Sequence, residues 1–201
     1  MQSYHDLSIT ATTIDPSIST DIEPVLNFSM ISPGIYRSSM PKKRNFAFLK
    51  KLRLRSVLTL ILEEYPIANS KFLSENSIQL LQFGVPGNKE PFVDIPEDVI
   101  ALALSAILDV RNHPILIHCN KGKHRTGCLA GCLRKLQHWT LTSIFDEYRR
   151  FSFPKSRSMD QQFIELFDQA QVCVDPDHLP KWPEISNDLF QLKSTVGQLV
   201  L

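Results

Sequence analysis

The chain has 201 residues, of which 43% are hydrophobic and 21% are charged, and its formal net charge at pH 7 is +1. This length suits one domain with extensions rather than two domains, and the apolar content is sufficient for a core without disulfides or a structural metal. A net charge so close to zero excludes a general attraction to nucleic acids or membranes, so any basic site must be local.

Residues 1–26 are rich in Ser, Thr, Asp and Pro and show no hydrophobic period. We expect a flexible N-terminal arm here. Its beginning lacks the basic start and apolar run of a secretory signal, and no apolar stretch in the chain is long enough to span a bilayer. These features predict an intracellular protein in a reducing compartment, with the cytoplasm expected and the nucleus as the alternative.

From residue 27 onward, short apolar runs alternate with segments of helical periodicity. In chain order, the predicted elements are a turn at 31–34, a strand at 35–37, a helix at 45–54, a buried strand at 56–61, a helix at 68–76, a strand at 78–85, a loop at 86–91, a helix at 95–110, a strand at 114–118, and helices at 126–137, 141–151 and 158–170. This alternation predicts an α/β fold with a central, mostly parallel sheet and helices on both faces. We expect a catalytic domain at 27–170 and a proline-interrupted tail at 171–201.

The segment 118–127, HCNKGKHRTG, indicates a functional site and lies between the last apolar strand and a helix. Ligands bind at such strand ends in open α/β sheets. A loop there directs backbone N–H groups inward, and the following helix N-terminus adds partial positive charge. The sequence therefore predicts an anion-binding cup.

Within this loop, Cys119 is the predicted nucleophile, because amide donors and a helix N-terminus stabilise a thiolate. Arg125, six positions later, is predicted to hold two phosphate oxygens with its planar guanidinium. Thr126 is predicted to donate its hydroxyl to the Cys119 sulfur and to help the thiolate leave in a second step. Gly122 permits a backbone turn that a side chain would obstruct.

The other loop residues are predicted to bind substrate. Lys121, Lys123 and His124 make the cup basic, which favours a substrate with several phosphates, and Asn120 lies among them. A nucleotide-binding P-loop of the Walker type is excluded, because the order of its glycines and lysine is not present.

The remaining cysteines give no sign of a metal site. The four cysteines, at 119, 128, 132 and 173, contain no C-x-x-C pair, so we expect no zinc and no disulfide framework. Cys128 and Cys132 lie four residues apart among leucines, which is typical of a buried helix face. Either one is a candidate partner for a protective disulfide with an oxidised Cys119.

The string H-C-x-x-G-x-x-R-T-G matches the signature of the protein tyrosine and dual-specificity phosphatase superfamily. The longer run HCNKGKHRTGCLAGCLRKLQHW, with FGVPGNKEPFVDIP and LRSVLTLILEEYP before it and TSIFDEYRRF after it, resembles the plant-and-fungal atypical dual-specificity phosphatases over about 27–169. The resemblance implies a compact α/β phosphatase fold, a phosphocysteine on Cys119, transition-state support from Arg125, and no metal or other cofactor. It also implies a polyphosphorylated small-molecule substrate, an inositol pyrophosphate cleaved at the β-phosphate.

The region of the general acid departs from the pattern of ordinary dual-specificity phosphatases, which place an aspartate about thirty residues before the cysteine. Here the candidates are Glu90 and Asp94, with surface charge as the alternative for Glu90 and helix capping for Asp94. A phosphate-ester leaving group departs without full protonation, so a strong acid is not required. Asn88 and Lys89, in the same loop, are predicted substrate contacts.

Two further stretches have open interpretations. Asp146 and Glu147 orient Arg125 or Lys123, are solvated, or pair with Arg149 and Arg150 at helical spacing. The segment 36–38, Tyr-Arg-Ser, is predicted to be structural rather than catalytic.

Three functions remain open from the sequence. The first is an inositol pyrophosphate phosphatase, the second is a phosphotyrosine or dual-specificity phosphatase acting on phosphoproteins, and the third is a non-catalytic phosphate-binding scaffold. No partner nucleic acid, membrane or particular protein is predicted.

Overall fold

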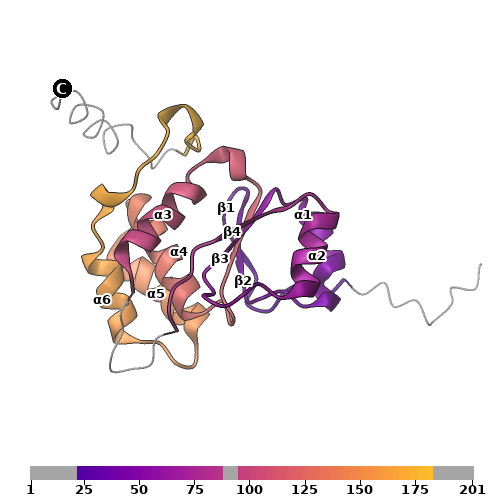
Figure 1. Cartoon of the computed structure of the whole chain (residues 1–201). Helices are drawn as coiled ribbons and strands as arrows, with labels where there is room; N and C mark the ends of the chain where they lie inside the picture. The colour runs from indigo at the N-terminus through magenta and orange to yellow at the C-terminus, as the bar shows by residue number, and fades with distance from the viewer. Residues whose placement is uncertain (1–21, 88–94, 183–201) are drawn as a thin grey trace, which may run out of the picture.

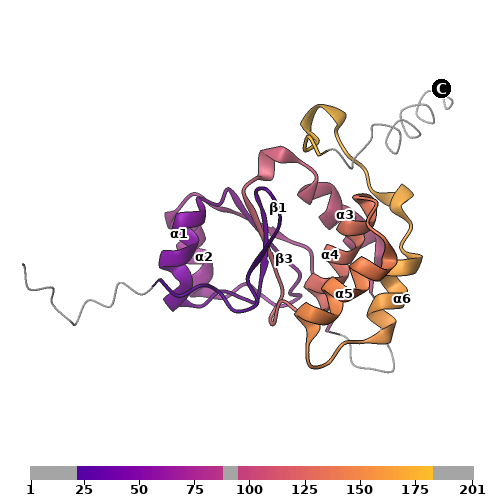
Figure 2. The same ribbon diagram turned by 180° about the vertical axis from the view of Figure 1, so that it is seen from behind.

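The computed structural model describes residues 22–87 and 95–182, which form a five-stranded sheet with helices on both faces (Figures 1 and 2). The strand order is β1-β2-β5-β3-β4. Only β1 and β2 pair in antiparallel fashion, and the other three strand pairs are parallel. The strands are β1 (Ser29–Ser32), β2 (Ile35–Ser38), β3 (Ser56–Thr59), β4 (Gln79–Gln82) and β5 (Ile115–His118).

The register places three strand ends side by side. Ser38 of β2 and Thr59 of β3 both lie opposite His118, the last residue of the central strand β5. These three strands run parallel and therefore finish at the same end of the sheet, where the chain segments that follow them meet. This end is where α/β sheets bind ligands.

The helices divide into two layers of unequal size (Figure 1). One face of the sheet is covered by α1 (Phe46–Leu52) and α2 (Ile67–Glu75). The other is covered by α3 (Glu97–Ile107), α4 (His124–Leu136), α5 (Leu141–Ser152) and α6 (Ser158–Leu166). No helix in the described parts of the chain combines the length and apolar character needed to cross a membrane.

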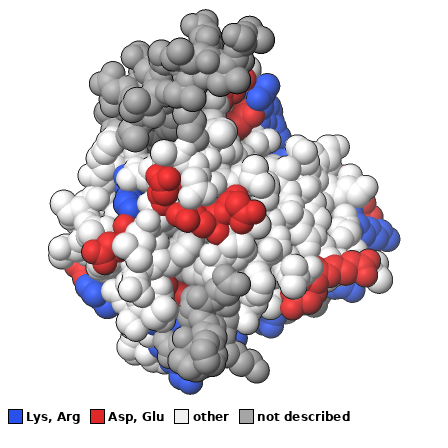
Figure 3. Space-filling view, turned by 60° about the vertical axis from the view of Figure 1, so that its left-hand side comes forward, with Lys and Arg blue, Asp and Glu red and all other residues white. Residues whose placement is uncertain are grey.

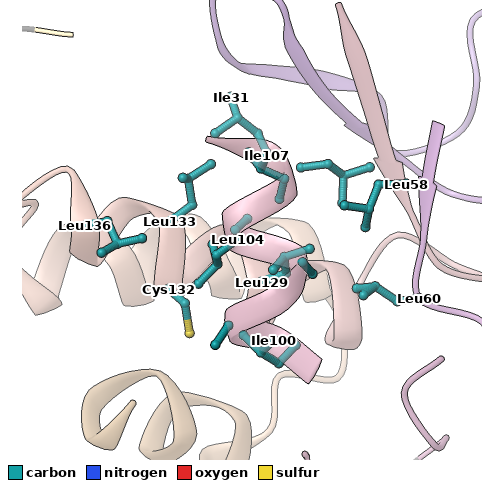
Figure 4. Packing of buried hydrophobic residues seen from close by; sticks show 14 of the residues in the cluster. Ile31, Leu58, Leu60, Ile100, Leu104, Ile107, Leu129, Cys132, Leu133 and Leu136 are labelled. Carbon is teal, nitrogen blue, oxygen red and sulfur yellow. The ribbon is translucent and has the colours of Figure 1, made fainter. Parts of the chain in front are cut away.

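The central strand explains the two layers. All four residues of β5 are buried, and successive side chains of a strand point to opposite faces. Ile115 and Ile117 belong to the apolar cluster under α3 and α4, whereas Leu116 belongs to the cluster under α1 and α2. Figure 4 shows Ile100, Leu104 and Ile107 of α3 among side chains of α4 and the sheet. The parallel sheet with helices on both faces, predicted from the sequence, is confirmed.

The structure differs from the sequence prediction in details. The predicted turn at 31–34 overlaps β1, a four-residue strand that was not predicted, and the turn itself is confined to Pro33 and Gly34. The strand predicted at 78–85 is shorter, Gln79–Gln82, and it is the outermost strand on one side of the sheet. The helices predicted to end at 110 and 170 end at Ile107 and Leu166, and each is followed by a short 3-10 helix.

Parts of the predicted extensions lie outside the described residues, namely 1–21 and 183–201. Within the described part of the predicted arm, Val25 is buried in the cluster of α1 and α2. Within the described part of the predicted tail, Val172 is buried in the other cluster and Trp182 packs against it.

Candidate active site

The loop between β5 and α4 borders a cavity of about 520 Å³ at the end of the sheet where the parallel strands finish. The loop and the first residues of α4 contribute Cys119, Asn120, Lys121, His124 and Arg125 to its wall. The segment after β4 contributes Val85 and Gly87, and the region around the start of α6 contributes Lys155, Arg157 and Asp160. The sequence-predicted nucleophile and arginine therefore share one cavity.

The backbone of the loop is shaped by Gly122, whose φ angle is +64°. A Cβ atom at this position would lie 2.4 Å from the carbonyl carbon and oxygen of Ser38. Only glycine tolerates both the left-handed conformation and this contact. Gly122 therefore lets the loop lie directly on the segment that follows β2.

The carbonyl of Gly122 is held from outside the loop by two donors. Nδ2 of Asn27 donates to it at 2.9 Å, and Nη2 of Arg37 donates at 3.1 Å. In a trans peptide unit the C=O and the next N–H point in opposite directions. Fixing this oxygen against the scaffold therefore directs the N–H of Lys123 toward the inside of the loop. The backbone N–H of Met40 fixes the Asn120 carbonyl in the same way, at 3.2 Å.

Arg37 is itself fixed by its surroundings. Its side chain is 1% exposed, its guanidinium carbon lies 3.9 Å from the centroid of the Phe151 ring, and Nη1 lies 3.7 Å from a carboxylate oxygen of Glu147. Burial lowers the pKa of Arg37 to about 10, while Glu147 opposes this shift, so the group stays charged at neutral pH. Arg37, predicted to be structural, thus holds the backbone of the loop through the Gly122 carbonyl.

The two acidic residues with open interpretations separate in the structure. Asp146 pairs with Arg149 on the surface, as one alternative predicted. Glu147 is buried and pairs with Arg37 and, at 2.8 Å, with Arg134. Neither carboxylate has a hydrogen bond or ion pair to Arg125 or Lys123 among the contacts of the described residues, so the alternative in which they orient these side chains is not the one observed.

Arg125 lies at the cavity wall with its guanidinium anchored through a single nitrogen. Nη1 donates to the carbonyl of Leu60 at 3.0 Å and to that of Val85 at 2.9 Å. These carbonyls follow β3 and β4, so the sheet itself sets the position of the guanidinium. Because both bonds use Nη1, Arg125 would bind two phosphate oxygens through Nη2 and Nε, which form the planar fork suited to oxyanions.

Cys119 is 4% exposed and sits at the start of the loop, facing the cavity that it helps to line. The helix α4 begins five residues later, so its first N–H groups and its partial positive charge point toward the loop. A thiolate at this position lies in the electropositive setting typical of nucleophilic cysteines.

The residue before the nucleophile, His118, is fully buried between the sheet and the loop. Its Nε2 shares a hydrogen bond of 2.9 Å with the Tyr65 hydroxyl, and Nδ1 lies 3.3 Å from the carbonyl of Cys119. Burial lowers the pKa of His118 to about 4, so the imidazole is neutral at physiological pH. His118 therefore positions the start of the loop and does not supply a proton.

The predicted role of Thr126 needs a correction. Its Oγ1 is buried and has no hydrogen-bond partner among the described residues, so the expected bond to the Cys119 sulfur is not formed. Thr126 is the third residue of α4, and its position is set by the helix rather than by the sulfur. A buried hydroxyl without a partner is uncommon in folded proteins.

Two of the basic residues predicted to bind substrate form hydrogen bonds with the segment after α5 instead. Nζ of Lys123 donates to the carbonyl of Phe153 at 2.6 Å, and Lys123 does not line the cavity of Cys119. Nε2 of His124 lies 2.7 Å from the carbonyl of Lys155, although His124 does line this cavity. The contribution of Lys123 to the anion cup is therefore its backbone N–H. The predicted contacts Asn88 and Lys89 and the candidate acids Glu90 and Asp94 lie outside the described residues.

Sequence reasoning missed the contribution of Lys155, Arg157 and Asp160. They lie more than thirty residues from the nucleophile and reach the cavity only because α5 and α6 pack against α4. The Tyr148 hydroxyl donates to the buried Asp160 carboxylate, and burial raises the pKa of Asp160. The basic run around Lys155, between two predicted helices, was the available signal.

The buried cysteines differ in position. Cys128 lines the cavity of Cys119, whereas Cys132 does not. Burial raises the pKa of both thiols, so neither is a thiolate at neutral pH. Of the two candidates for a disulfide with Cys119, only Cys128 shares its cavity.

Comparison with known proteins identifies the family of this chain and several relatives. A family model described as the tyrosine phosphatase family matches residues 22–186. Inositol diphosphatase SIW14 of Saccharomyces cerevisiae is 55% identical over 161 residues, which cover 80% of this chain and 57% of the yeast protein. Inositol diphosphatase DSP1 of Oryza sativa is 58% identical over 157 residues, which cover 78% of this chain and 69% of the rice protein. The chain therefore spans little more than half of the yeast relative.

A solved structure supports the same relationship. The crystal structure of the core catalytic domain of the yeast PP-IP phosphatase SIW14, in complex with citrate, superposes with a TM-score of 0.71 at 56% identity. The match covers 74% of this chain and 89% of that chain.

Proposed function

The chain belongs to the tyrosine phosphatase family, and from this premise we propose that it is a cysteine-dependent phosphatase that removes the β-phosphate of inositol pyrophosphates. The observation that carries the proposal is the cavity that Cys119 and Arg125 both line, in a chain whose aligned residues are 55% and 58% identical to relatives named inositol diphosphatases.

The reaction proceeds in two steps. In the first, the Cys119 sulfur attacks the β-phosphorus, an S–P bond forms, and the bond from phosphorus to the bridging oxygen breaks. The electron pair leaves with the inositol α-phosphate, which is a stable leaving group without a proton. In the second, water attacks the phosphocysteine, the S–P bond breaks, and orthophosphate is released with the thiolate restored.

The protein stabilises charge on the transferred phosphoryl group. The inward N–H groups of the loop and the fork of Arg125 surround its equatorial oxygens, and such preorganised donors are worth most where charge develops. The loop does not need to reorganise, because Asn27, Arg37 and Gly122 already fix its backbone.

The charges of the cavity favour a polyanion. Among the described residues, the cationic side chains of its wall are Lys121, Arg125, Lys155 and Arg157, and the carboxylic acid is Asp160. The chain as a whole has a net charge of only +1, so this excess is local. On the face shown in Figure 3, acidic groups lie both near the middle and toward the edges, basic groups lie mostly toward the edges, and neither sign covers the face.

Phosphate release from purified protein tests the proposal. We expect the wild type to release orthophosphate from inositol diphosphate species faster than from phosphotyrosine peptides, and Cys119→Ser to abolish release. A rate on inositol diphosphates no better than on the peptides would contradict the proposed substrate.

A phosphoprotein phosphatase is the second candidate. A protein of Dictyostelium discoideum named as a probable tyrosine-protein phosphatase is 42% identical over 163 residues, which cover 81% of this chain and 97% of that protein. If this candidate is right, the peptide substrates in the same assay are the faster ones. Activity that depends on Cys119 in either case rules out a purely non-catalytic scaffold.

A further inference from the structure

A second cavity, of about 820 Å³, lies next to the catalytic one and shares Asn120 and Lys121 with it. Its other walls come from the segment after β2, including Lys42, and from the end of α5, including Arg150 and Phe151. The segment after β2 leaves the sheet at the same end as the catalytic loop, and residues of that loop line both cavities.

The wall of the second cavity is cationic. It carries Lys42, Lys121, Lys123 and Arg150, and no Asp or Glu among the described residues lines it. None of the four forms an ion pair with another described residue. Four cations around one cavity repel each other, so an anion bound there would relieve an unfavourable arrangement.

Two of these cations make contacts within the protein. Nζ of Lys123 donates to the carbonyl of Phe153 at 2.6 Å, and the guanidinium carbon of Arg150 lies 5.5 Å from the centroid of the Phe151 ring. Restricting these side chains before a ligand arrives lowers the entropy lost on binding. The apolar parts of the wall, Met40 and Phe153, offer contact for the C–H groups of a cyclic polyol.

We infer that this cavity is a second anion-binding subsite, which receives phosphates of an inositol polyphosphate that are not being cleaved. The inference rests on the proposed function for the identity of the ligand. The shared residues Asn120 and Lys121 make it possible for one ligand to contact both cavities across the rim of the loop. Affinity for a polyphosphorylated ring then depends on residues that never touch the phosphate under attack.

Inhibition by inositol hexakisphosphate, which has no diphosphate to cleave, tests this subsite. The substrate is p-nitrophenyl phosphate, which is small enough to occupy the catalytic cavity alone. We expect the inhibition constant to rise roughly three- to tenfold in Lys42→Ala and in Arg150→Ala, and more in the double variant. Arg150→Lys should restore part of the loss, because the charge is kept.

The control is Lys71→Ala on α2, an exposed lysine whose only described ion pair is with Glu75. It removes the same charge from the far helix layer and should change the inhibition constant less than twofold. Equal inhibition constants in the wild type and in the Lys42 and Arg150 variants would overturn the inference, as would an absence of inhibition in the wild type. Inhibition by vesicles containing phosphoinositides but not by soluble hexakisphosphate would also overturn it.

The outcome separates this inference from the proposed function. Hydrolysis of inositol diphosphates by the wild type tests the function and needs none of these variants. If that hydrolysis fails while the inhibition constants rise as expected, the subsite stands and the assigned reaction is wrong. If hydrolysis succeeds while the inhibition constants do not change, the reaction stands and the subsite is wrong.

Discussion

At the scale of single residues, the carbonyl of Gly122 shows how a short loop can present amide donors to an anion. Two side-chain donors, from Asn27 and Arg37, fix this oxygen on the outer side of the loop. That Cys119 and Arg125 lie in one site could be predicted from sequence, because they belong to one contiguous motif. The supporting residues could not, because Gly122 lies 95 positions from Asn27 and 85 from Arg37. Only folding brings them together.

Replacing Arg37 by methionine should therefore weaken catalysis without removing any group that contacts the phosphate. We expect kcat for p-nitrophenyl phosphate to fall about 10- to 100-fold, less than the loss on deleting a transition-state donor outright. KM should change little, because the loop amides matter most when charge develops. Steady-state kinetics measure both values. Arg37→Lys is the control, and an unchanged kcat in Arg37→Met would show that the loop holds its shape unaided.

Replacing Arg125 by lysine should lower kcat by about three orders of magnitude while the protein remains folded, because the charge is kept but the planar fork is lost. Kinetics and circular dichroism together check this. A loss of less than tenfold would contradict the role of the guanidinium.

His118 predicts a pH dependence of stability. Its pKa in the folded protein, about 4, is below the value of about 6.5 for an unfolded chain. Between these values the unfolded state binds more protons, so stability is lost as pH falls from about 6.5 toward 4, by roughly 2–3 kcal/mol. Urea denaturation at a series of pH values measures the loss. His118→Gln should flatten the curve in this window, and parallel curves would refute the assignment.

At the scale of elements, a buried polar network connects β1, β2, α4 and α5. Glu147 of α5 bridges Arg37 of β2 and Arg134 of α4, and Arg134 continues through Gln137 to Ser32 of β1. Hydrophobic periodicity predicted most of the helices and strands correctly, but it missed β1. That strand has four residues and its Met30 is exposed, so its pairing with β2, rather than its own pattern, makes it a strand.

Removing the charge of Glu147 should destabilise this network. In Glu147→Gln, two buried arginines lose their carboxylate, and we expect the free energy of unfolding to fall by about 3 kcal/mol. Asp146→Asn on the same helix is the matched control. Its carboxylate is exposed and pairs with Arg149 at the surface, so the change should stay within about 0.5 kcal/mol. Equal losses of unfolding free energy in both variants would show that the buried ion pairs contribute no more to stability than the surface pair does.

At the scale of the whole molecule, the fold converts a nearly neutral chain into a concentrated positive field at one end of the sheet. The strands that end at His118, Ser38 and Thr59 bring three chain segments to the same place, and two cationic cavities lie there. Composition gave no hint of this, since the net charge is +1. The basic residues after α5 reach the site through helix packing, which no local sequence pattern encodes.

This concentration of charge predicts a difference in salt dependence between substrates. Raising the ionic strength should lower kcat/KM for an inositol diphosphate much more steeply than for p-nitrophenyl phosphate, because screening acts on every phosphate of the polyanion. Measuring both substrates over the same range of salt concentrations checks this. Parallel slopes would mean that the surrounding cations do not contribute to substrate capture.

The most direct test of the account is to trap the phosphorylated enzyme. Wild-type protein is mixed with an inositol diphosphate, quenched with acid within one turnover, digested and analysed by mass spectrometry. The peptide containing Cys119 should gain the mass of one phosphoryl group, and Cys119→Ser should give neither this adduct nor turnover. Orthophosphate release by a Cys119→Ser protein, or a phosphoryl group found only on another residue, would contradict this mechanism.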